Sequence, residues 1–259
     1  MTTTTRPLEN GYLDDTPVQD TVLRRFLHNQ ADLTALIAEA GGGDVVRRAD
    51  VVVAAFDTPV VYQNEAVLLR PLTGLDDEVL DLAEAQLAAR HGVLVSAWPT
   101  PDLTARGWEL VGHPTFVVRG PQPAVADRSV VRRATTPEEL AVAERVVAEG
   151  YPVPEAQGAP PGFGYPAGVL GSALNVYLGL HEDEVVATAA SYEAHGLLNL
   201  CMAATLPAAR RHGVWSALAH TRLAQAPHLP AAATTSDYSR KGFEKLGFQP
   251  VTRLTMWAR

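Results

Sequence analysis

The chain repeats the order of its predicted elements once, and this repeat is the feature that most constrains its fold. In both halves an amphipathic helix is followed by a strand, a short helix and a final strand. Identical residues recur at an offset of 140: Gly107 and Gly247, Val111 and Val251, Thr115 and Thr255, Arg119 and Arg259, Ser96 and Ser236, Arg70 and Arg210. The chain of 259 residues has room for two domains of ordinary size. We therefore expect two related α/β units, the alternative being two unrelated halves with similar endings.

A short segment rich in proline and glycine separates the two halves. Residues 120–124 read Gly-Pro-Gln-Pro-Ala and have no apolar periodicity, which is typical of a linker. We expect a first unit over 1–119, a linker over 120–128 and a second unit over 129–259. Residues 1–18 are polar and without pattern, and we expect a tail there.

Apolar periodicity predicts helices and strands in both units. The predicted helices cover 21–39, 75–90, 101–106, 137–149, 213–226 and 239–246. The predicted strands cover 51–56, 60–69, 92–98, 110–119, 129–133, 175–181, 185–194, 197–205, 229–235 and 251–258. The clearest helix start is Thr136-Pro137-Glu138-Glu139, with threonine as the N-cap and glutamate three residues later.

Composition excludes several kinds of protein. The 29 acidic and 21 basic residues give a formal net charge of −8, which argues against a nucleic-acid partner. No apolar run approaches the roughly 18 residues that span a bilayer, and the first residues lack the apolar core of a signal peptide. One cysteine, Cys201, forms neither an intrachain disulfide nor a multi-cysteine metal cage. We expect a cytoplasmic protein without membrane or metal.

The stretch 206–218 is the most informative one for function. It joins an apolar strand to an amphipathic helix through a turn that holds Arg210, Arg211, His212 and Gly213. A helix N-terminus presents free N–H groups and the positive end of its dipole, and glycine lets an anion approach the backbone closely. The turn therefore predicts an anion site. The alternative is a solvated basic turn.

Two motifs in the second half resemble those of the GNAT superfamily of acyl-CoA N-acyltransferases. Arg210-x-x-Gly213-x-Trp215 is similar to the acyl-CoA-binding signature, and Phe243-Glu244-Lys245-Leu246-Gly247-Phe248 is similar to a Tyr-x-x-Leu-Gly-Phe motif near the end. The resemblance covers 129–259 directly and 20–119 through the repeat. It implies an α/β (α+β) protein of two GNAT-like units with a degenerate first copy. Each unit would have a mixed, mostly antiparallel central sheet flanked by helices.

The resemblance also implies a co-substrate, acetyl-CoA or another acyl-CoA, and the residues that hold it. Pantetheine would pair with the backbone at Ala203 and Thr205, where two central strands separate. A backbone N–H near Cys201–Ala203 would polarise the thioester carbonyl for direct attack by an amine. The pyrophosphate would lie beside Arg210 on the amides of Arg211, His212, Gly213, Val214, Trp215 and Ser216.

Some positions depart from the family pattern. The family's thiolate-protonating tyrosine corresponds to Phe243, a glutamate base to Asn199, and a CoA-contacting asparagine to Ser236, while Trp215 replaces a small residue. We keep Phe243 and Ser236 among the expected CoA contacts. As substitute catalytic groups we consider the polar residues expected near the acceptor, each of which could instead be an ordinary turn or surface residue: Glu193, His195, Asn199 and Tyr238.

Other chemistry-bearing residues have structural interpretations. Cys201 lies in an apolar strand without a matched histidine and aspartate, so we interpret it as a packed thiol. The loop 151–166 could line an acceptor pocket with Tyr151, Phe163 and Tyr165, or be a proline-stiffened surface loop. In the first copy the corresponding helix begins with Asp76, Asp77 and Glu78, which would repel a pyrophosphate. We therefore expect a structural first unit that binds no CoA.

The preferred function is transfer of an acyl group, most simply acetyl, from acyl-CoA to a small-molecule amine. The first alternative is a non-catalytic acyl-CoA-binding or sensing protein. The second is a protein or aminoacyl-tRNA acyltransferase, which the acidic composition disfavours. The identity of the acceptor, the length of the acyl chain and the oligomeric state stay open.

Overall fold

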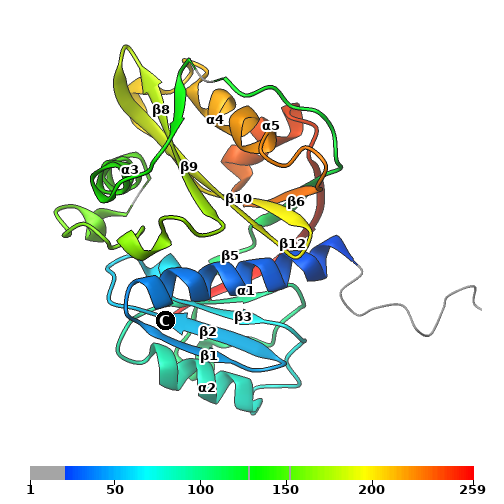
Figure 1. The fold of residues 1–259 in the computed structure, drawn as a ribbon. Helices are drawn as coiled ribbons and strands as arrows, with labels where there is room; N and C mark the ends of the chain where they lie inside the picture. Colours follow the sequence, from blue (N-terminus) through cyan, green and yellow to red (C-terminus); the bar gives the residue numbers. More distant parts are fainter. Residues whose placement is uncertain (1–20, 128, 152) are drawn as a thin grey trace, which may run out of the picture.

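The computed structural model describes residues 21–127, 129–151 and 153–259, so the tail expected over 1–18 lies outside the described residues. Two mixed β-sheets lie one above the other, each flanked by helices (Figure 1). The α/β architecture predicted from the sequence is confirmed. None of the described helices is long and apolar enough to cross a membrane.

In the first half of the chain, the described residues from 21 onwards form two α-helices and six strands. In chain order they are α1 Val22–Ala40, β1 Asp44–Arg47, β2 Val51–Ala55, β3 Glu65–Leu68, α2 Glu78–Leu87, β4 Val93–Ser96, β5 Glu109–Gly112 and β6 Thr115–Arg119. The strand β1 has no counterpart among the predicted elements. The predicted helix over 101–106 is a single 3₁₀ turn, Thr104–Arg106.

The second half forms three α-helices and seven strands. They are β7 Val131–Arg133, α3 Pro137–Gly150, β8 Leu174–His181, β9 Glu184–Ala194, β10 Leu197–Thr205, α4 Val214–Leu223, β11 Ala231–Thr235, α5 Asp237–Lys245, β12 Gln249–Arg253 and β13 Thr255–Ala258. The start signal of α3 is confirmed, because the Thr136 hydroxyl accepts a hydrogen bond from the Glu139 amide.

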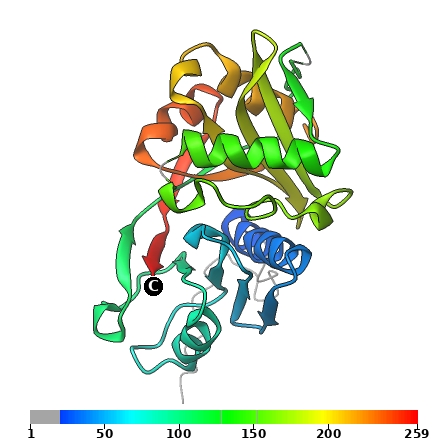
Figure 2. The same cartoon turned by 90° about the vertical axis from the view of Figure 1, so that its left-hand side faces the viewer.

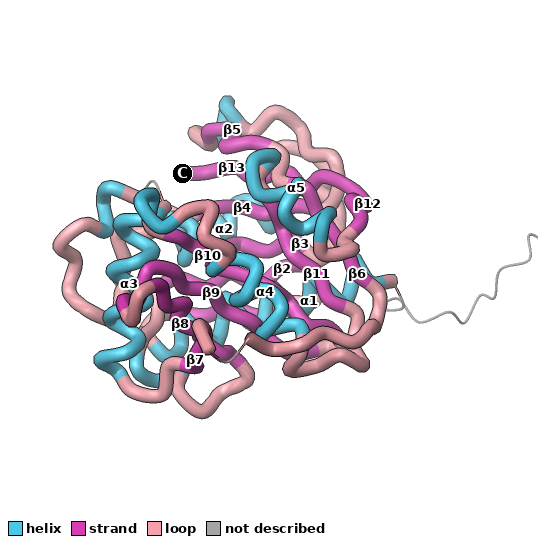
Figure 3. Tube along the Cα trace, turned by 90° about the horizontal axis from the view of Figure 1, so that it is seen from above, coloured by secondary structure: helices cyan, strands magenta, loops and turns pink. Residues whose placement is uncertain are grey.

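The two sheets exchange one strand each. The first sheet has the order β1-β2-β3-β4-β13-β5, and the second has the order β12-β6-β11-β10-β9-β8-β7. The C-terminal strand β13 thus runs down into the first sheet beside β4 and β5, while β6 crosses into the second sheet (Figures 2 and 3). If β13 is left out of the first sheet and β6 out of the second, the order β1-β2-β3-β4-β5 matches the order β8-β9-β10-β11-β12. The predicted duplication is therefore confirmed at the level of topology.

This exchange corrects two expectations. The single strands predicted over 110–119 and 251–258 are each two strands that belong to different sheets. The chain leaves one sheet at His113-Pro114, where proline offers no N–H to a ladder, and at the buried Leu254. Residues 115–119, which we expected in the first unit, therefore belong to the second sheet. Residues 255–258, which we expected in the second unit, belong to the first sheet. The alternation of apolar and polar residues along a strand is the same whichever sheet the strand joins. The sequence pattern therefore does not indicate which strand it pairs with.

The helix α1 joins the two units by packing between their sheets. It contacts β2 and β3 on one side and β9 and β10 on the other (Figure 1). Phe26 stacks on Phe116 of the exchanged β6, with ring centroids 4.8 Å apart. The buried Asn29 side chain donates to backbone carbonyls at the end of β9 and the start of β10. Because α1 is buried by both units, they share one hydrophobic cluster built around it.

Candidate functional site

A notch opens in the second sheet where two parallel strands separate. β10 and β11 pair only at Leu198 with Ala231 and at Asn199 with Ala232, although both strands continue beyond these residues. A β-bulge between Cys201 and Ala204 bends β10 further, with Met202 at a φ of 52°. Backbone groups beyond Asn199 on the β11 side of β10 are thereby released from the ladder, and residues 201–203 are partly exposed.

The helix α4 begins beside the carboxyl end of β10, and its N-terminus carries no side-chain cap. Gly213 is its N-cap, at a φ of 81° in the left-handed region where glycine is favoured. The other four α-helices of the described ranges have a hydroxyl or carboxylate that accepts from their first turn, supplied by Thr21, Asp77, Thr136 and Ser236. At α4 the first amides are left for another acceptor, and a Cβ on Gly213 would meet no atom within 4 Å.

The basic residues of this turn have different surroundings. Arg211 and His212 are exposed, and the His212 ring lies 4.4 Å from that of His181. The Arg210 guanidinium instead donates to the carbonyls of Gly150 at 3.0 Å and Thr205 at 3.3 Å, which ties the end of α3 to the end of β10. Arg210 is also exposed, but its guanidinium is bonded to backbone carbonyls, whereas the exposed side chains of Arg211 and His212 can approach an anion.

Aromatic residues of both motifs pack between α4 and α5. The Trp215 indole lies edge-on to Phe243 at 5.2 Å, and Phe243 is edge-on to Phe248 at 5.1 Å. Gly242 makes room for the indole, since a Cβ there would come within 2.9 Å of the ring. The bulk of Trp215 is thus accommodated away from the helix N-terminus. Phe243 is a buried core residue with no proton to donate.

The remaining residues expected to hold CoA lie on α4, on β10 and at the start of α5. Val214, the first residue of α4, is buried against Gly179 of β8. Ser216 is partly exposed in the first turn of the same helix. Ala203 and Thr205 are on β10 beyond its last pair with β11. The Ser236 hydroxyl accepts from the Ser239 amide at 3.2 Å and caps α5.

The expected catalytic residues are not gathered in one place. Glu193 and His195 lie at the amino end of β10, roughly 15 Å along the strand from the bulge at about 3.3 Å per residue. His195 is bound there to Asp32, with Nε2 and Oδ2 2.7 Å apart. Tyr238 is 86% exposed at the start of α5. Asn199, at the closed end of the notch, is buried and donates from Nδ2 to Gln30 Oε1 at 3.1 Å.

In the loop 151–166, the described residues around Tyr165 pack against the bulge. Phe163 and Tyr165 are buried, and the Tyr165 hydroxyl donates to the Met202 carbonyl at 3.3 Å. The buried carboxylate of Glu144 on α3 holds the loop by accepting from three of its amides: Gly162, Gly164 and Tyr165. Tyr151 is exposed. The loop therefore contributes an ordered wall to this end of the notch.

Two side chains at the bulge, the Cys201 thiol and the Arg222 guanidinium, lie in surroundings with little water. Burial raises the pKa of the Cys201 thiol to about 12, so the thiol stays protonated and unreactive near neutral pH. This supports its interpretation as a packed residue. Arg222, which the sequence analysis did not single out, is fully buried and donates to the carbonyls of Leu218 and Ala190. An arginine in the last turn of a helix ordinarily lies on the surface, so no sequence pattern marked it.

In the first unit the chain's own carboxylate occupies the corresponding helix N-terminus. Asp77 caps α2 by accepting from the Val79 amide at 3.0 Å, and it also accepts from the Thr73 amide at 2.9 Å. Arg70 donates to both carboxylate oxygens, at 2.6 and 2.9 Å. The strands β3 and β4, which correspond to β10 and β11, stay paired up to Val67 and Val95, next to the ends of both strands. They therefore do not separate as β10 and β11 do. The turn that would hold an anion in this copy is thus filled by Asp77.

Replacing Asp77 by alanine is expected to lower the free energy of unfolding by about 2–4 kcal/mol near neutral pH. The hydrogen bond from Arg70 lowers the pKa of the Asp77 carboxyl in the folded protein. Its stabilisation is therefore complete above the ordinary aspartate pKa near 4 and is lost progressively as the pH falls towards the lower native value. Urea denaturation of both proteins at several pH values should show the difference between them shrinking below about pH 4. A difference independent of pH would contradict the ion pair.

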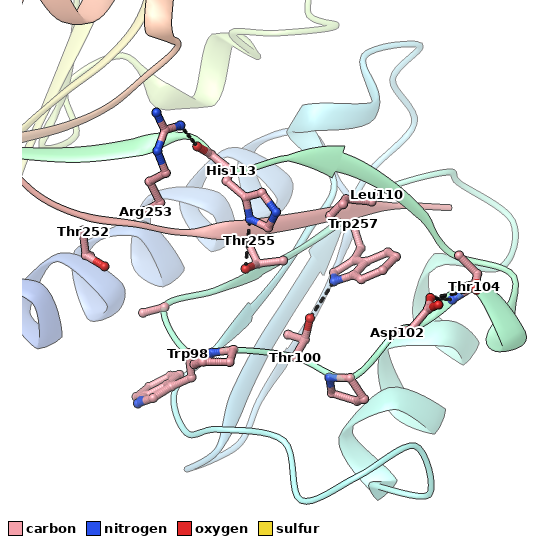
Figure 4. Close-up of a pocket in the computed structure, with 13 residues that line it drawn as sticks. Trp98, Thr100, Asp102, Thr104, Leu110, His113, Thr252, Arg253, Thr255 and Trp257 are labelled. Carbon is pink, nitrogen blue, oxygen red and sulfur yellow. Dashed lines mark hydrogen bonds between the residues drawn. The ribbon is translucent and has the colours of Figure 1, made fainter.

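A separate open cavity of about 690 Å³ lies in the first unit beside β13 (Figure 4). It is formed because residues 97–103 run as a proline-containing loop at the place that α5 takes in the second unit. Its polar groups bond to one another, as Trp257 Nε1 does to Thr100 Oγ1 at 2.9 Å and Arg253 does to the His113 carbonyl at 2.7 Å. Sequence analysis did not predict this cavity, because its walls come from residues 97–104 and from 252–257, which are far apart in the chain.

Comparison with known proteins supports the fold. No protein-family model matches the sequence, and no curated protein does. Among solved structures, the chain is similar to a GCN5-related N-acetyltransferase from Kribbella flavida, with 19% identity, a TM-score of 0.62 and coverage of 92% of this chain and 95% of the other. A GCN5-related N-acetyltransferase from Sphaerobacter thermophilus matches with 14% identity, a TM-score of 0.53 and coverage of 89% and 91%. A tandem GNAT protein from the clavulanic acid biosynthesis pathway matches with 14% identity, a TM-score of 0.50 and coverage of 90% and 94%.

Proposed function

Because the chain has the tandem GNAT fold, we propose that it transfers an acyl group, most simply acetyl, from acyl-CoA to the amine of a small molecule. The second unit carries the site and the first binds no CoA. The proposal retains the cytoplasmic location and the absence of a nucleic-acid partner that the composition favours.

The observation that carries the proposal is the continuous path from the N-terminus of α4 to the bulge of β10. The uncapped amides after Gly213, together with Arg211 and His212, suit a pyrophosphate. Beyond Asn199, β10 has a free edge towards β11, which suits an extended chain with amide groups such as pantetheine. The bulge at Met202 ends this path and turns backbone groups out of the ladder, where one N–H can polarise a carbonyl.

The chemistry needs few side chains. The amine nitrogen attacks the thioester carbon, a C–N bond forms, and the C–S bond breaks with its electron pair leaving on sulfur. The released thiolate is a fair leaving group, so an acid is not essential, which is consistent with Phe243 at the position of the family tyrosine. A base that removes the proton of the amine would add about 10²–10⁴-fold to the rate.

Isothermal titration with acetyl-CoA is expected to show one site per chain, because Asp77 fills the equivalent turn of the first unit. Release of free thiol in the presence of a panel of primary amines should then reveal turnover. Binding without thiol release would favour an acyl-CoA-binding protein, and two equivalent sites would contradict the assignment of the first unit. Absence of saturable binding would overturn the proposed function.

A further inference from the structure

Glu65 is a buried carboxyl group that the first unit places against the second. It begins β3, is 7% exposed, and lies under α1. Its Oε2 accepts hydrogen bonds from Gln30 Nε2 and Thr34 Oγ1, both at 2.8 Å. Among the described residues no donor reaches Oε1. Burying a carboxyl group is costly unless it is well bonded, and the two hydrogen bonds to Oε2 offset part of that cost.

The carboxyl group is connected to the closed end of the notch. Gln30, which donates to Glu65, accepts from Asn199 Nδ2 at 3.1 Å through its other amide atom. Asn199 is the last residue of β10 that pairs with β11 before the strands separate. The Glu65 carboxylate thus lies one side chain away from the point where the notch begins.

A second observation places the carboxyl group near the bulge. Glu65 and Val67 are two residues apart on β3 and so point to the same face, and Cys201 packs against the hydrophobic cluster that contains Val67. Cys201 and Asn199 are two residues apart on one strand and so point to the same face of the sheet. That face packs on α1 and α3, whereas α4 packs on the opposite face. Glu65 is therefore on the side of the notch opposite the proposed pyrophosphate site.

The surroundings of Glu65 favour a proton acceptor. Desolvation raises the pKa of its carboxyl group above the ordinary value, and the two hydrogen bonds only partly oppose this effect. A carboxyl group with a raised pKa is a stronger base than a solvated glutamate. Among the described residues, the side chains that donate hydrogen bonds to it are Gln30 and Thr34 from α1.

The geometry points to Glu65, contributed by the first unit, as the residue that accepts the proton of the attacking amine in the second unit. This inference rests on the proposed acyl transfer. The Glu65 carboxylate takes one proton from the bound ammonium group through water, and the neutral amine then attacks the thioester carbon. As the C–N bond forms and the C–S bond breaks, the second N–H proton passes to the released thiolate or to solvent, and Glu65 releases its own proton to solvent, which restores the carboxylate. The degenerate copy would thereby supply the base that β10 lacks at Asn199.

The variant Glu65→Gln tests this role. The glutamine amide oxygen can still accept from Gln30 and Thr34, so we expect acetyl-CoA affinity and the unfolding midpoint to be retained. With an alkylamine, which is protonated at neutral pH like a lysine side chain, kcat/KM should fall about 100- to 1,000-fold. With hydroxylamine, which is already neutral at that pH, the fall should be less than about tenfold. A merely structural role would lower both rates equally.

Two further variants sharpen the test. Thr34→Val removes one donor that favours the charged carboxylate, so the acidic limb of the kcat/KM profile should move to higher pH. Glu109→Gln neutralises an exposed glutamate on β5 and should change neither rate nor profile. An unchanged rate and pH profile in Glu65→Gln would overturn the role of Glu65 alone, and so would loss of acetyl-CoA binding in that variant. Absence of turnover by the wild-type protein with every amine would overturn the proposed function and this role together.

Discussion

Replacing Gly213 by glutamate is expected to weaken acetyl-CoA binding at least about 100-fold while the protein stays folded. The new carboxylate would lie at the N-terminus of α4, where it competes with a pyrophosphate for the first amides and repels its charge. Any side chain at position 213 must also adopt the left-handed conformation at a φ of 81°, which lowers the free energy of unfolding by about 1–2 kcal/mol. Titration calorimetry measures the affinity, and thermal unfolding verifies the fold.

Two matched variants separate charge from backbone strain. Gly213→Ala imposes the same strain with no charge and meets no atom within 4 Å, so its affinity for acetyl-CoA should change far less. Gly74→Glu adds the same charge to the corresponding turn of the first unit, also in open space, and should leave the affinity unchanged. Tight binding by a folded Gly213→Glu protein would place the pyrophosphate elsewhere.

Replacing Trp257 by alanine is expected to lower the free energy of unfolding by about 3–5 kcal/mol. Trp257 belongs to the C-terminal strand but is buried in the core of the first unit, against residues such as Leu94 and Trp108. Its indole N–H also donates to Thr100. Removal of the ring leaves a cavity in a sheet that β13 holds together between β4 and β5. Urea denaturation gives the magnitude.

The location of the damage tests the strand exchange. Hydrogen exchange in Trp257→Ala should show the largest loss of protection in β4 and β5 of the first unit. Val251→Ala, at a residue 60% exposed on the neighbouring β12, should cost less than about 0.5 kcal/mol. Loss of protection confined to the second unit would contradict the exchange. A fragment of residues 1–122 would lack β13 and carry an unpaired β6, so CoA binding should be tested in the full chain.

The two copies have diverged at one helix N-terminus. In the first unit a carboxylate from the chain satisfies the amides of α2 and pairs with Arg70. In the second unit glycine takes the cap position and leaves the amides of α4 without a side-chain acceptor. Asp77 thus fills the turn of the first copy and at the same time bonds to the amide of Val79 in α2 and to Arg70.

Local features of this protein could be predicted from the sequence because they depend on neighbours within one or two turns. The cap at Thr136, the glycine that begins α4 and the order of helices and strands in both copies are of this kind. Helical and strand periodicity identifies an element and its buried face without reference to the rest of the fold. The repeat then predicted a second copy of the same topology.

The tertiary structure decided which distant groups meet. Pairing partners of β6 and β13, the use of the Arg210 guanidinium on the Gly150 carbonyl, and the connection from Glu65 through Gln30 to Asn199 all join residues far apart in the chain. The alternation of apolar and polar residues along a strand is the same in either sheet. The sequence around a polar side chain is also the same whether that side chain bonds to water or to another side chain. The packing of α1 between the two sheets sets the connection from Glu65 to Asn199, since it brings these polar groups within hydrogen-bonding distance, and the packing of α3 on β10 sets the bond from Arg210 to Gly150.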